Sequence, residues 1–405
     1  MNKTKISAEI VADSLDSRGN RLTSLLITFP RIILAEINTH RMLSKNTSSS
    51  RAIPFKKMVE AVQENPFIPI AWQKEHKGMQ GTEYITDETE IENCKSLWLV
   101  ARNHATDDAR RLHDVSNITK QLCNRLLEPF MWTTMLITGS KEGWDNFFSL
   151  RCPDYVFHDE NKEYHFKSKK DVIQKFGESE WVEDEYDKPL KDLTDIDWLK
   201  LNKGQAEIHI MDLAEKIYDA VNESTPKQLQ AGEWHIPFED KINVNDVKEI
   251  IINDLKLKGE DYGELEISKW YNEVQYEKVK ISVAMAARTS YTVVGDEKEI
   301  DYAKMIELHD RLLAQKPPHS SPLEHCARAM SDEEYTSFIK GQYPMFKDDW
   351  GIGNHETYLF RTEKMFEGNE EEFEPTTKTL MPIHGWCNNL KGFIPYRYLI
   401  DNQMM

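Results

Sequence analysis

One stretch near the beginning of the chain gathers side chains that can bind an anion. Residues 39–54 read THRMLSKNTSSSRAIP, with hydroxyl groups and an amide between two arginines. Hydroxyl and backbone N–H donors at the start of a helix can hold a phosphate, and guanidinium groups can pair with two of its oxygens. The glycines of a Walker loop are missing. The same composition also fits a polar loop that caps the helix expected from Pro54.

The overall composition restricts the kind of protein that this chain can be. Its 405 residues are 40% apolar and include 10 Trp, 15 Tyr and 16 Phe, which predicts a folded protein. A formal net charge of −18 disfavours binding to nucleic acid, whose readers usually carry a basic stripe. An anionic ligand therefore requires a local group of arginines.

The sequence predicts a cytoplasmic protein without membrane contact. No run approaches the roughly 18 consecutive apolar residues of a membrane helix, and residues 1–10 lack the apolar core of a signal peptide. The cysteines are scattered without a CxxC pair, so we expect neither disulfides nor a metal cluster. His319 and His325 are six positions apart, but no carboxylate or cysteine spacing completes a metal site around them.

The polar stretch is expected to follow a sheet. Strands are predicted at Ile6–Ala12 and Leu22–Phe29, on either side of the turn signal Ser17–Asn20. The apolar run Ile32–Ile37 is interpreted as a further strand. The stretch would then leave this sheet and enter the helix beginning at Pro54.

Apolar periodicity predicts helices in the rest of the chain. Helical patterns cover about residues 88–113, 116–127, 205–221, 247–255 and 300–314. Met131–Ile137 is expected to be core rather than a cofactor-binding segment. Residues 152–204 are highly charged and show little periodicity, which predicts a solvated insertion. The segment Gly232–Pro237 either covers an active site or is a loop anchored by its Trp.

Several separate blocks resemble the motifs of the flavin-dependent thymidylate synthases. His40 and Arg41, followed after seven residues by Ser49 and Arg51, resemble the family's Arg-His-Arg-x7-Ser signature. Three later blocks resemble its Ala-Arg-x-x-Leu-Pro, Asn-Phe-x-x-Leu-Arg and Ala-Gln-x-Glu-Ile motifs: NRLLEP at 124–129, NFFSLR at 146–151 and QAEI at 205–208.

Two further blocks resemble family motifs but occur in circularly permuted order. AARTSY at 286–291 resembles Ala-Ala-Arg-x-Ser, and HSSPLEH at 319–325 resembles His-x-Ser/Thr-Pro-Phe-Glu-His. Both normally precede the Arg-His-Arg motif, whereas here they follow it. Permutation is tolerated where the ends of a fold lie close together. It predicts that the segment just after His325 lies beside the N-terminal strands.

The resemblance implies an α/β (α+β) fold, with a mixed, largely antiparallel sheet flanked by helices. It implies a single catalytic domain over 1–405, with a core of about 1–151, 205–222 and 281–330. The remaining segments would be an acidic insertion at 152–204, an insertion at 223–280 and a C-terminal extension at 331–405. Family members are homotetramers with sites at subunit junctions, so Arg125 could act in a neighbouring chain's site.

The implied activity is reductive methylation of dUMP to dTMP, with FAD as cofactor and methylenetetrahydrofolate and NADPH as co-substrates. Arg151 would be the catalytic residue, binding the pyrimidine edge and favouring its N3-deprotonated form. Together with Arg151, the substrate-binding residues would be Glu36, Thr47, Ser48, Ser49, Ser50, Arg51 and Arg125. The flavin-binding residues would be Thr39, His40, Arg41, Asn146, Ser290, His319, Ser321 and Glu324. No metal is implied.

Departures from the family pattern leave alternatives open. Thr39 replaces the first Arg of the signature, Glu36 a Gln, Thr47 a Glu and Ala52 a Tyr. One alternative is a related flavin- and folate-dependent enzyme that acts on dCMP or makes a hydroxymethyl product. Another is a non-catalytic nucleotide-binding homologue. None of the cysteines lies in a setting that resembles the cysteine nucleophile of the classical thymidylate synthase route.

Overall fold

The computed structural model describes residues 4–77, 81, 83–159, 162–178, 181–182, 188–259, 267–291, 300–316, 319–345 and 379–404. Parts of the predicted insertions at 152–204 and 223–280, of the C-terminal extension and of the loop at 317–322 lie outside these residues.

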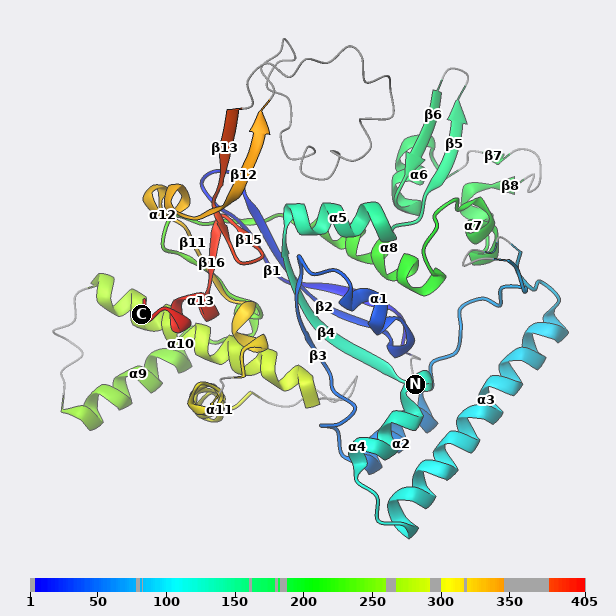
Figure 1. The fold of residues 1–405 in the computed structure, drawn as a ribbon, viewed down its shortest axis with the longest axis horizontal. Helices are drawn as coiled ribbons and strands as arrows, with labels where there is room; N and C mark the ends of the chain where they lie inside the picture. Colours follow the sequence, from blue (N-terminus) through cyan, green and yellow to red (C-terminus); the bar gives the residue numbers. More distant parts are fainter. Residues whose placement is uncertain are drawn as a thin grey trace.

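The centre of the fold is a mixed, mostly antiparallel sheet, which confirms the predicted class (Figure 1). Its strand order is β3-β4-β2-β1-β9. Neighbouring strands are antiparallel except for β1 and β9, which pair in parallel. The strands are β1 (Ser7–Leu15), β2 (Arg21–Pro30), β3 (Ser44–Thr47), β4 (Trp132–Ser140) and β9 (Lys227–Gln228).

The turn between β1 and β2 forms for a local reason. One carboxylate oxygen of Asp16 accepts hydrogen bonds from the backbone N–H groups of Arg18 (2.9 Å) and Asn20 (2.8 Å). Gly19 adopts φ +84°, a conformation that residues with a Cβ rarely adopt. Both strands predicted around this turn are confirmed.

The run Ile32–Ile37 is helical, so its interpretation as a strand was wrong. It forms η1 (Arg31–Ile33) and α1 (Leu34–Asn38). Ile33 and Ile37 are both buried, and their spacing of four residues places them on one face of a helix. The polar stretch then rejoins the sheet, because its own residues form β3 at the edge next to β4.

Two helices cover one face of the sheet (Figure 1). They are α5 (Lys141–Arg151) and α8 (Ile208–Glu223), and α8 confirms the helix predicted from position 205. Trp144, Phe147 and Ile217 pack with apolar residues of β2 and β4 in one buried cluster. This packing fixes the C-terminal end of α5, where Arg151 lies.

A helical group lies beyond the β3 end of the sheet. The long helix predicted near position 88 is confirmed, but residues 116–127 form only a short α-helix followed by a 3₁₀ turn that contains Pro129. Proline lacks a backbone N–H group and interrupts a regular helix. The elements are α2 (Phe55–Glu64), α3 (Glu88–Arg110), η2 (Arg111–Val115), α4 (Lys120–Cys123) and η3 (Asn124–Phe130).

A second helical group and a small sheet lie on the other side of the central sheet from this first group (Figure 1). The helices include the two predicted at 247–255 and 300–314. The elements are β10 (Trp234–His235), η5 (Glu239–Lys241), α9 (Val244–Lys258), α10 (Ile267–Arg288), η7 (Thr289–Tyr291), α11 (Tyr302–Ala314), η8 (Ser321–Glu324) and β11 (Ala327–Ala329).

The segment after His325 lies beside the N-terminal strands, as permutation predicts. Ala327 and Ala329 of β11 pack in one buried cluster with Leu22 of β2. Arg18, in the β1–β2 turn, donates a hydrogen bond to the carbonyl oxygen of Met330 at 3.5 Å.

Residues 152–204 contain a small apolar core, so the prediction of a solvated segment was wrong. Tyr155, Val172, Leu190 and Trp198 are buried together. The elements around them are β5 (Tyr155–Asp159), β6 (Lys162–Phe166), α6 (Lys169–Phe176), β7 (Trp181–Val182), β8 (Lys188–Pro189), η4 (Leu190–Asp192) and α7 (Asp195–Leu201). The division of the chain into a core and insertions stays a prediction.

Part of the predicted C-terminal extension completes the protein core. Phe393, Ile394 and Tyr396 have no exposed surface (0%). The elements are α12 (Asp332–Ser337), β12 (Ile339–Met345), β13 (Thr379–His384), β14 (Trp386–Cys387), β15 (Leu390–Lys391), β16 (Phe393–Pro395) and α13 (Tyr396–Asp401). Within the described part of the chain, no helix has the length and apolarity needed to cross a membrane.

Candidate functional site

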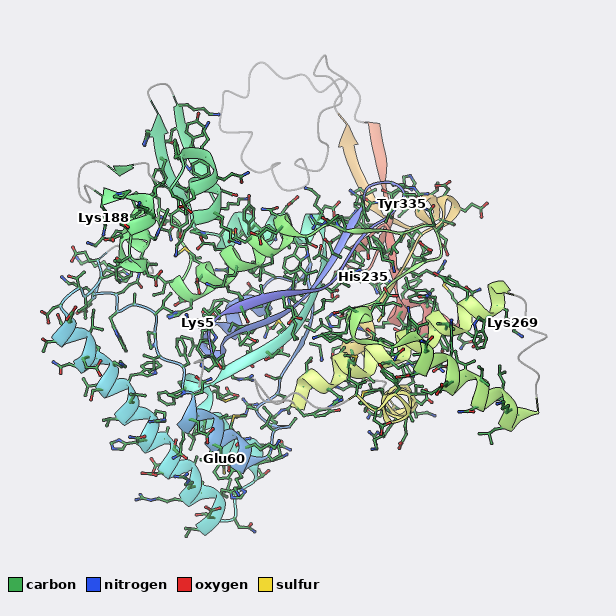
Figure 2. The ribbon with its side chains drawn as sticks, turned by 180° about the vertical axis from the view of Figure 1, so that it is seen from behind. Lys5, Glu60, Lys188, His235, Lys269 and Tyr335 are labelled. Carbon is green, nitrogen blue, oxygen red and sulfur yellow. The ribbon has the colours of Figure 1, made fainter. Side chains whose placement is uncertain are left out.

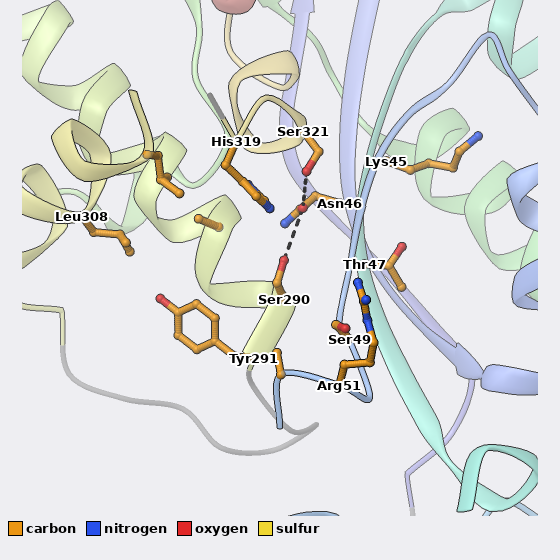
Figure 3. A pocket seen from close by; sticks show the side chains of 13 residues that line it. Lys45, Asn46, Thr47, Ser49, Arg51, Ser290, Tyr291, Leu308, His319 and Ser321 are labelled. Atoms are coloured by element: carbon orange, nitrogen blue, oxygen red, sulfur yellow. Dashed lines mark hydrogen bonds between the residues drawn. The ribbon is translucent and has the colours of Figure 1, made fainter. Parts of the chain in front are cut away.

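Asn46 joins three motif blocks that are far apart in the sequence. Its Oδ1 accepts hydrogen bonds from the hydroxyl groups of Ser321 (2.9 Å) and Ser290 (3.4 Å). Its Nδ2 donates to the carbonyl oxygen of Ala286 (2.5 Å) and to Oγ1 of Thr289 (2.8 Å). Figure 3 shows the amide between the two serines. The blocks at 39–54, 286–291 and 319–325 therefore meet at one buried side chain.

A cleft of about 510 Å³ lies at this meeting point. It brings together predicted nucleotide-binding residues, Ser49 and Arg51 among them, and predicted flavin-binding residues from the two permuted blocks (Figure 3). The lining residues that were predicted are Thr47, Ser49, Arg51, Ser290, His319 and Ser321, and those that were not are Lys45, Asn46, Ala52, Ala287, Tyr291, Leu308 and Leu312.

The charged residues that line the cleft are basic. Among its lining residues these are Lys45 and Arg51, although the whole chain carries a net charge of −18. Burial lowers the pKa of Lys45 to about 8, against the opposing effect of Glu324. The Lys45 amine donates to the carbonyl oxygen of His40 and points to the other side of β3 from Asn46 (Figure 3). Arg51 is exposed, so its guanidinium group remains open to solvent and ligand.

The serine run alternates between the cleft and the protein interior. The backbone N–H of Ser49 donates to the carbonyl oxygen of Ser290 at 2.8 Å, which holds this residue at the cleft. Ser48 and Ser50 were predicted to bind substrate, but both side chains are buried. The Ser48 hydroxyl contacts Oγ1 of Thr133 (2.7 Å), and the Ser50 hydroxyl donates to Oε1 of Glu128 (2.5 Å). These two hydroxyl groups hold the loop in place.

Arg151 and His40 form a second polar cluster. The Nε–H of Arg151 donates to Nε2 of His40 at 2.9 Å, and its Nη2 lies 3.5 Å from Oγ1 of Thr39. The imidazole packs edge-on against Phe147, with ring centroids 4.8 Å apart. Burial lowers the pKa of His40 to about 4, and the positive charges of Arg151 and Lys45 act in the same direction. His40 is therefore neutral near pH 7 and accepts the hydrogen bond from Arg151.

The other predicted residues lie away from the cleft lining. Arg125 is exposed, although its neighbour Asn124 donates to the carbonyl oxygen of Ser50 at 2.6 Å. Arg41 is also exposed, and Asn146 is half-buried on α5. Glu324 pairs with Arg397.

Glu36 is the remaining predicted residue outside the cleft. Its Oε2 is buried and makes no hydrogen bond in the described structure. The roles assigned to all of these residues stay predictions.

A buried chain of hydrogen bonds crosses the sheet behind the cleft. Nδ1 of His325 lies 2.8 Å from Oγ1 of Thr138, which lies 2.6 Å from the hydroxyl group of Ser24. Ser24 in turn lies 2.8 Å from Nε2 of His235, beside the sheet in Figure 2. Gly232–Pro237 is therefore tied into the core through His235, whereas the expected anchor, Trp234, is partly buried beside Tyr396. No group of three or more metal-ligand side chains is arranged around a metal position in the described residues.

The buried cysteines are poorly suited to nucleophilic attack. Burial raises the pKa of Cys326 and of Cys387 to about 12, and it raises the pKa of Cys152 and Cys123 as well. All five cysteines are free thiols. A thiol with a raised pKa carries little of the thiolate that attacks carbon.

The structural role of Asn46 was missed by the sequence analysis. Asn46 belongs to the anion-binding stretch, but its position in the sequence gave it no role in the site. An amide can accept and donate at once, which made it a candidate for joining segments. Tyr291 is the last residue of a matched block and could also have been proposed as a site residue. Leu308 and Leu312 belong to an ordinary amphipathic helix, whose sequence does not indicate a binding site.

Comparison with known proteins found similar solved structures but no match in sequence. No protein-family model matches the chain, and no curated protein does so. The UMP/dUMP methylase PolB from Streptomyces cacaoi, bound with 5-Br dUMP, is 16% identical, with a TM-score of 0.31 over 41% of this chain and 84% of PolB. The same enzyme bound with 5-Br UMP is 17% identical, with a TM-score of 0.30 over 37% and 78%.

A flavin-dependent thymidylate synthase, ThyX from Helicobacter pylori complexed with FAD and dUMP, is also similar. It is 20% identical, with a TM-score of 0.21 over 32% of this chain and 58% of ThyX. This is the family whose motif blocks the sequence resembles. At TM-scores this low the likeness is partial.

Proposed function

We propose that the chain is a flavin-dependent thymidylate synthase-like enzyme that converts dUMP to dTMP. The observation that supports this most is the cleft beside Asn46. Residues predicted to bind the nucleotide, Ser49 and Arg51, and residues predicted to bind the flavin, Ser290 and Ser321, line the same cleft. The two sets come from distant parts of the sequence, so only the fold brings them together.

The chemistry of the lining fits an anionic ligand that carries a planar ring. Arg51 provides a guanidinium group, and Ser49, Ser290 and Ser321 provide hydroxyl groups for phosphate oxygens. Tyr291, Leu308 and Leu312 provide the apolar surface that a ring requires. FAD combines pyrophosphate with a flat ring system, and dUMP combines phosphate with a pyrimidine.

Bound FAD would supply the redox chemistry, with NADPH as reductant and methylenetetrahydrofolate as carbon donor. The residues of the chain position the reactants and stabilise charge. Arg51 and Ser49 hold the nucleotide phosphate, and Ser290, His319 and Ser321 hold the flavin. Neutral His40 accepts from Arg151 Nε and leaves the other guanidinium nitrogens available to bind the pyrimidine. Those groups stabilise negative charge that develops on the ring oxygen when N3 loses its proton.

We propose that complete sites form between copies of the chain in a homotetramer. Arg125 and Arg151 lie outside the cleft lining, so a neighbouring copy would bring them to it. Arg125 lies on an exposed surface of η3 and α4 where Leu122 and Leu126 are 58% and 41% exposed. Exposed leucines around an exposed arginine are typical of a surface that another chain covers.

A second candidate substrate is dCMP, which Glu36 favours. One carboxylate oxygen of Glu36 is buried without a hydrogen bond. The amino group of cytosine is a donor that could satisfy it, whereas the carbonyl oxygen of uracil at the same position is an acceptor. The same flavin and folate chemistry could also release a hydroxymethyl product.

Absorbance spectroscopy tests the proposed activity. Purified protein should show flavin bands or gain them with FAD, and added dUMP should perturb them. Turnover assays with dUMP and dCMP, with mass analysis of the product, distinguish the candidate reactions. Protein that takes up no flavin and produces no methylated nucleotide would contradict the enzyme proposal and favour a non-catalytic nucleotide-binding protein.

A further inference from the structure

A second cleft of about 430 Å³ lies between the sheet, α8 and residues 152–204. Ile6, Ile208 and Met211 contribute apolar surface from the core. Trp198, which is only 5% exposed, contributes an aromatic wall from α7. Its volume falls within the range of about 300–1,000 Å³ typical of small-molecule sites. It has no residue in common with the cleft beside Asn46.

The deepest charged group in this cleft is the carboxylate of Glu215. Its side chain comes from α8, and the residue is 7% exposed. Oε1 accepts a hydrogen bond from the backbone N–H of Lys169 at 2.7 Å, and Oε2 accepts one from the Tyr155 hydroxyl at 3.3 Å. Each carboxylate oxygen can accept more than one hydrogen bond, so both oxygens retain acceptor capacity.

The lysines of the second cleft are partly engaged by other acids. Lys216 pairs with Asp212, and the Lys169 ammonium lies 3.8 Å from Asp195. Lys5 lies at the rim, near the sheet end in Figure 2. Burial raises the pKa of Glu215 above its ordinary value, although Lys169 acts to lower it. Within the described residues Glu215 forms no ion pair, and a buried carboxyl group that lines a cleft is a candidate for ligand binding.

One lining residue of this cleft carries a donor without a hydrogen-bond partner in the described structure. The indole Nε1–H of Trp132, another lining residue, is buried and makes no hydrogen bond within the described structure. Buried polar groups are nearly always satisfied, so this one calls for a partner. The cleft thus offers a planar aromatic wall, a pair of acceptor oxygens and an unused donor.

We propose that this second cleft binds a fused heteroaromatic ring with two adjacent N–H donors. Such an edge consists of a ring N–H beside an exocyclic amino group, as in guanine and in pteridines. The two donors pair with the two oxygens of Glu215, and the ring packs against Trp198. In its ionised form Glu215 can only accept hydrogen bonds, so it selects an edge made of donors. The isoleucines and Trp198 in the lining favour a fused aromatic ring over a guanidinium group.

Isothermal titration calorimetry on the full chain tests this proposal. Excess dUMP is present throughout, so that the first cleft is occupied. The probes are guanosine, inosine, 6-methylpterin and L-argininamide. Inosine matches guanosine but lacks the amino group, so guanosine should bind about tenfold tighter, the change expected for one lost hydrogen bond. Binding of 6-methylpterin without guanosine would support the same edge and identify a pteridine as its source.

Two variants locate the binding. Glu215→Gln removes one acceptor and should weaken binding of the favoured ring about tenfold. Glu223→Gln makes the same change on an exposed side chain of the same helix and should leave binding unchanged. Equal affinity for guanosine and inosine, binding of neither ring probe, binding of L-argininamide alone, or unchanged affinity in Glu215→Gln would each overturn the proposal. The comparison of guanosine with inosine requires no variant and stands even if Glu215→Gln does not fold.

Discussion

Arg151 donates its Nε–H to Nε2 of His40 at 2.9 Å, which joins the end of α5 to the start of the anion-binding stretch. The neutral imidazole fixes the guanidinium group without neutralising its charge. His40 is in turn held by Phe147, in the core beneath α5.

The first prediction concerns Arg151 itself. Arg151→Ala should abolish turnover, by about a thousandfold or more, because the group that stabilises charge on the pyrimidine is lost. Its side chain is only half-buried, so the midpoint of thermal unfolding should change little. Arg151→Lys keeps the charge but loses the planar guanidinium group and should stay strongly impaired. Steady-state rates together with thermal unfolding test this, and wild-type turnover in Arg151→Ala would falsify the role.

The second prediction concerns Asn46. Asn46→Leu should destabilise the protein by about 2 kcal/mol or more, because the buried carbonyl group of Ala286 and the half-buried hydroxyl groups of Thr289 and Ser321 lose their partner. Flavin uptake should fall as well, since three blocks lose their connection. Chemical denaturation and a flavin titration measure the two effects. Asn243→Leu, at an exposed helix cap, is a control that should leave flavin uptake unchanged.

The third prediction concerns acid stability. Burial lowers the pKa of His235 to about 4 and that of His325 to about 3, whereas both would titrate near 6.5 in the unfolded chain. Below pH 6.5 the unfolded state binds protons that the folded state does not. Stability therefore falls as the pH drops from 6.5 towards 4, by about 1.4 kcal/mol per pH unit for each histidine. NMR titration of the two imidazole rings should show no protonation above pH 5, and titration of either ring near 6.5 would contradict this.

The fourth prediction concerns assembly. Leu122→Glu and Leu126→Glu place charges on the surface around Arg125 and should dissociate the proposed tetramer, as measured by light scattering. Activity should fall in parallel, because the proposed site needs residues from a neighbouring copy. Leu257→Glu, at an exposed leucine on α9, serves as the matched control. A wild-type protein that is monomeric and fully active would rule out a shared site.

The fifth prediction concerns Gly392, in the bend between β15 and β16. Its φ is +79°, and a Cβ here would lie 2.4 Å from Oδ2 of Asp16, the residue that holds the β1–β2 turn. Gly392→Ala should therefore destabilise the protein by about 1–3 kcal/mol. Gly177→Ala has a similar φ of +89° but no atom within 4 Å of the added Cβ, so it separates backbone strain from the clash. Equal losses in the two variants would show that the clash is unimportant.

The sequence predicted the parts of the fold that depend on local patterns. The strands around Gly19 and the helix from position 205 have clear periodicity and turn signals, and both are present. The run Ile32–Ile37 was assigned wrongly because a short apolar segment fits a strand or a helix equally well. The core around Tyr155 and Trp198 was missed because its residues are spread over more than 40 positions without a local repeat.

The candidate site was predictable in composition but not in geometry. Motif resemblance selected Ser49, Arg51 and Ser290, which line one cleft. It could not show that Ser48 and Ser50 point inward, because that depends on the pairing of β3 with β4 and on a partner, Glu128, far along the chain. The second cleft could not be predicted from the sequence either, because the residues that line it come from distant segments that only the fold brings together.

The late strand β16 has a consequence for how the polypeptide is made. Phe393 fills the same buried cluster as Leu22, and Asn389 donates to the carbonyl oxygen of Arg41, a residue 348 positions earlier. During translation the first strands therefore emerge from the ribosome long before the residues that cover them have been synthesised. The nascent chain must keep that apolar edge from aggregating for the time needed to translate more than 300 codons.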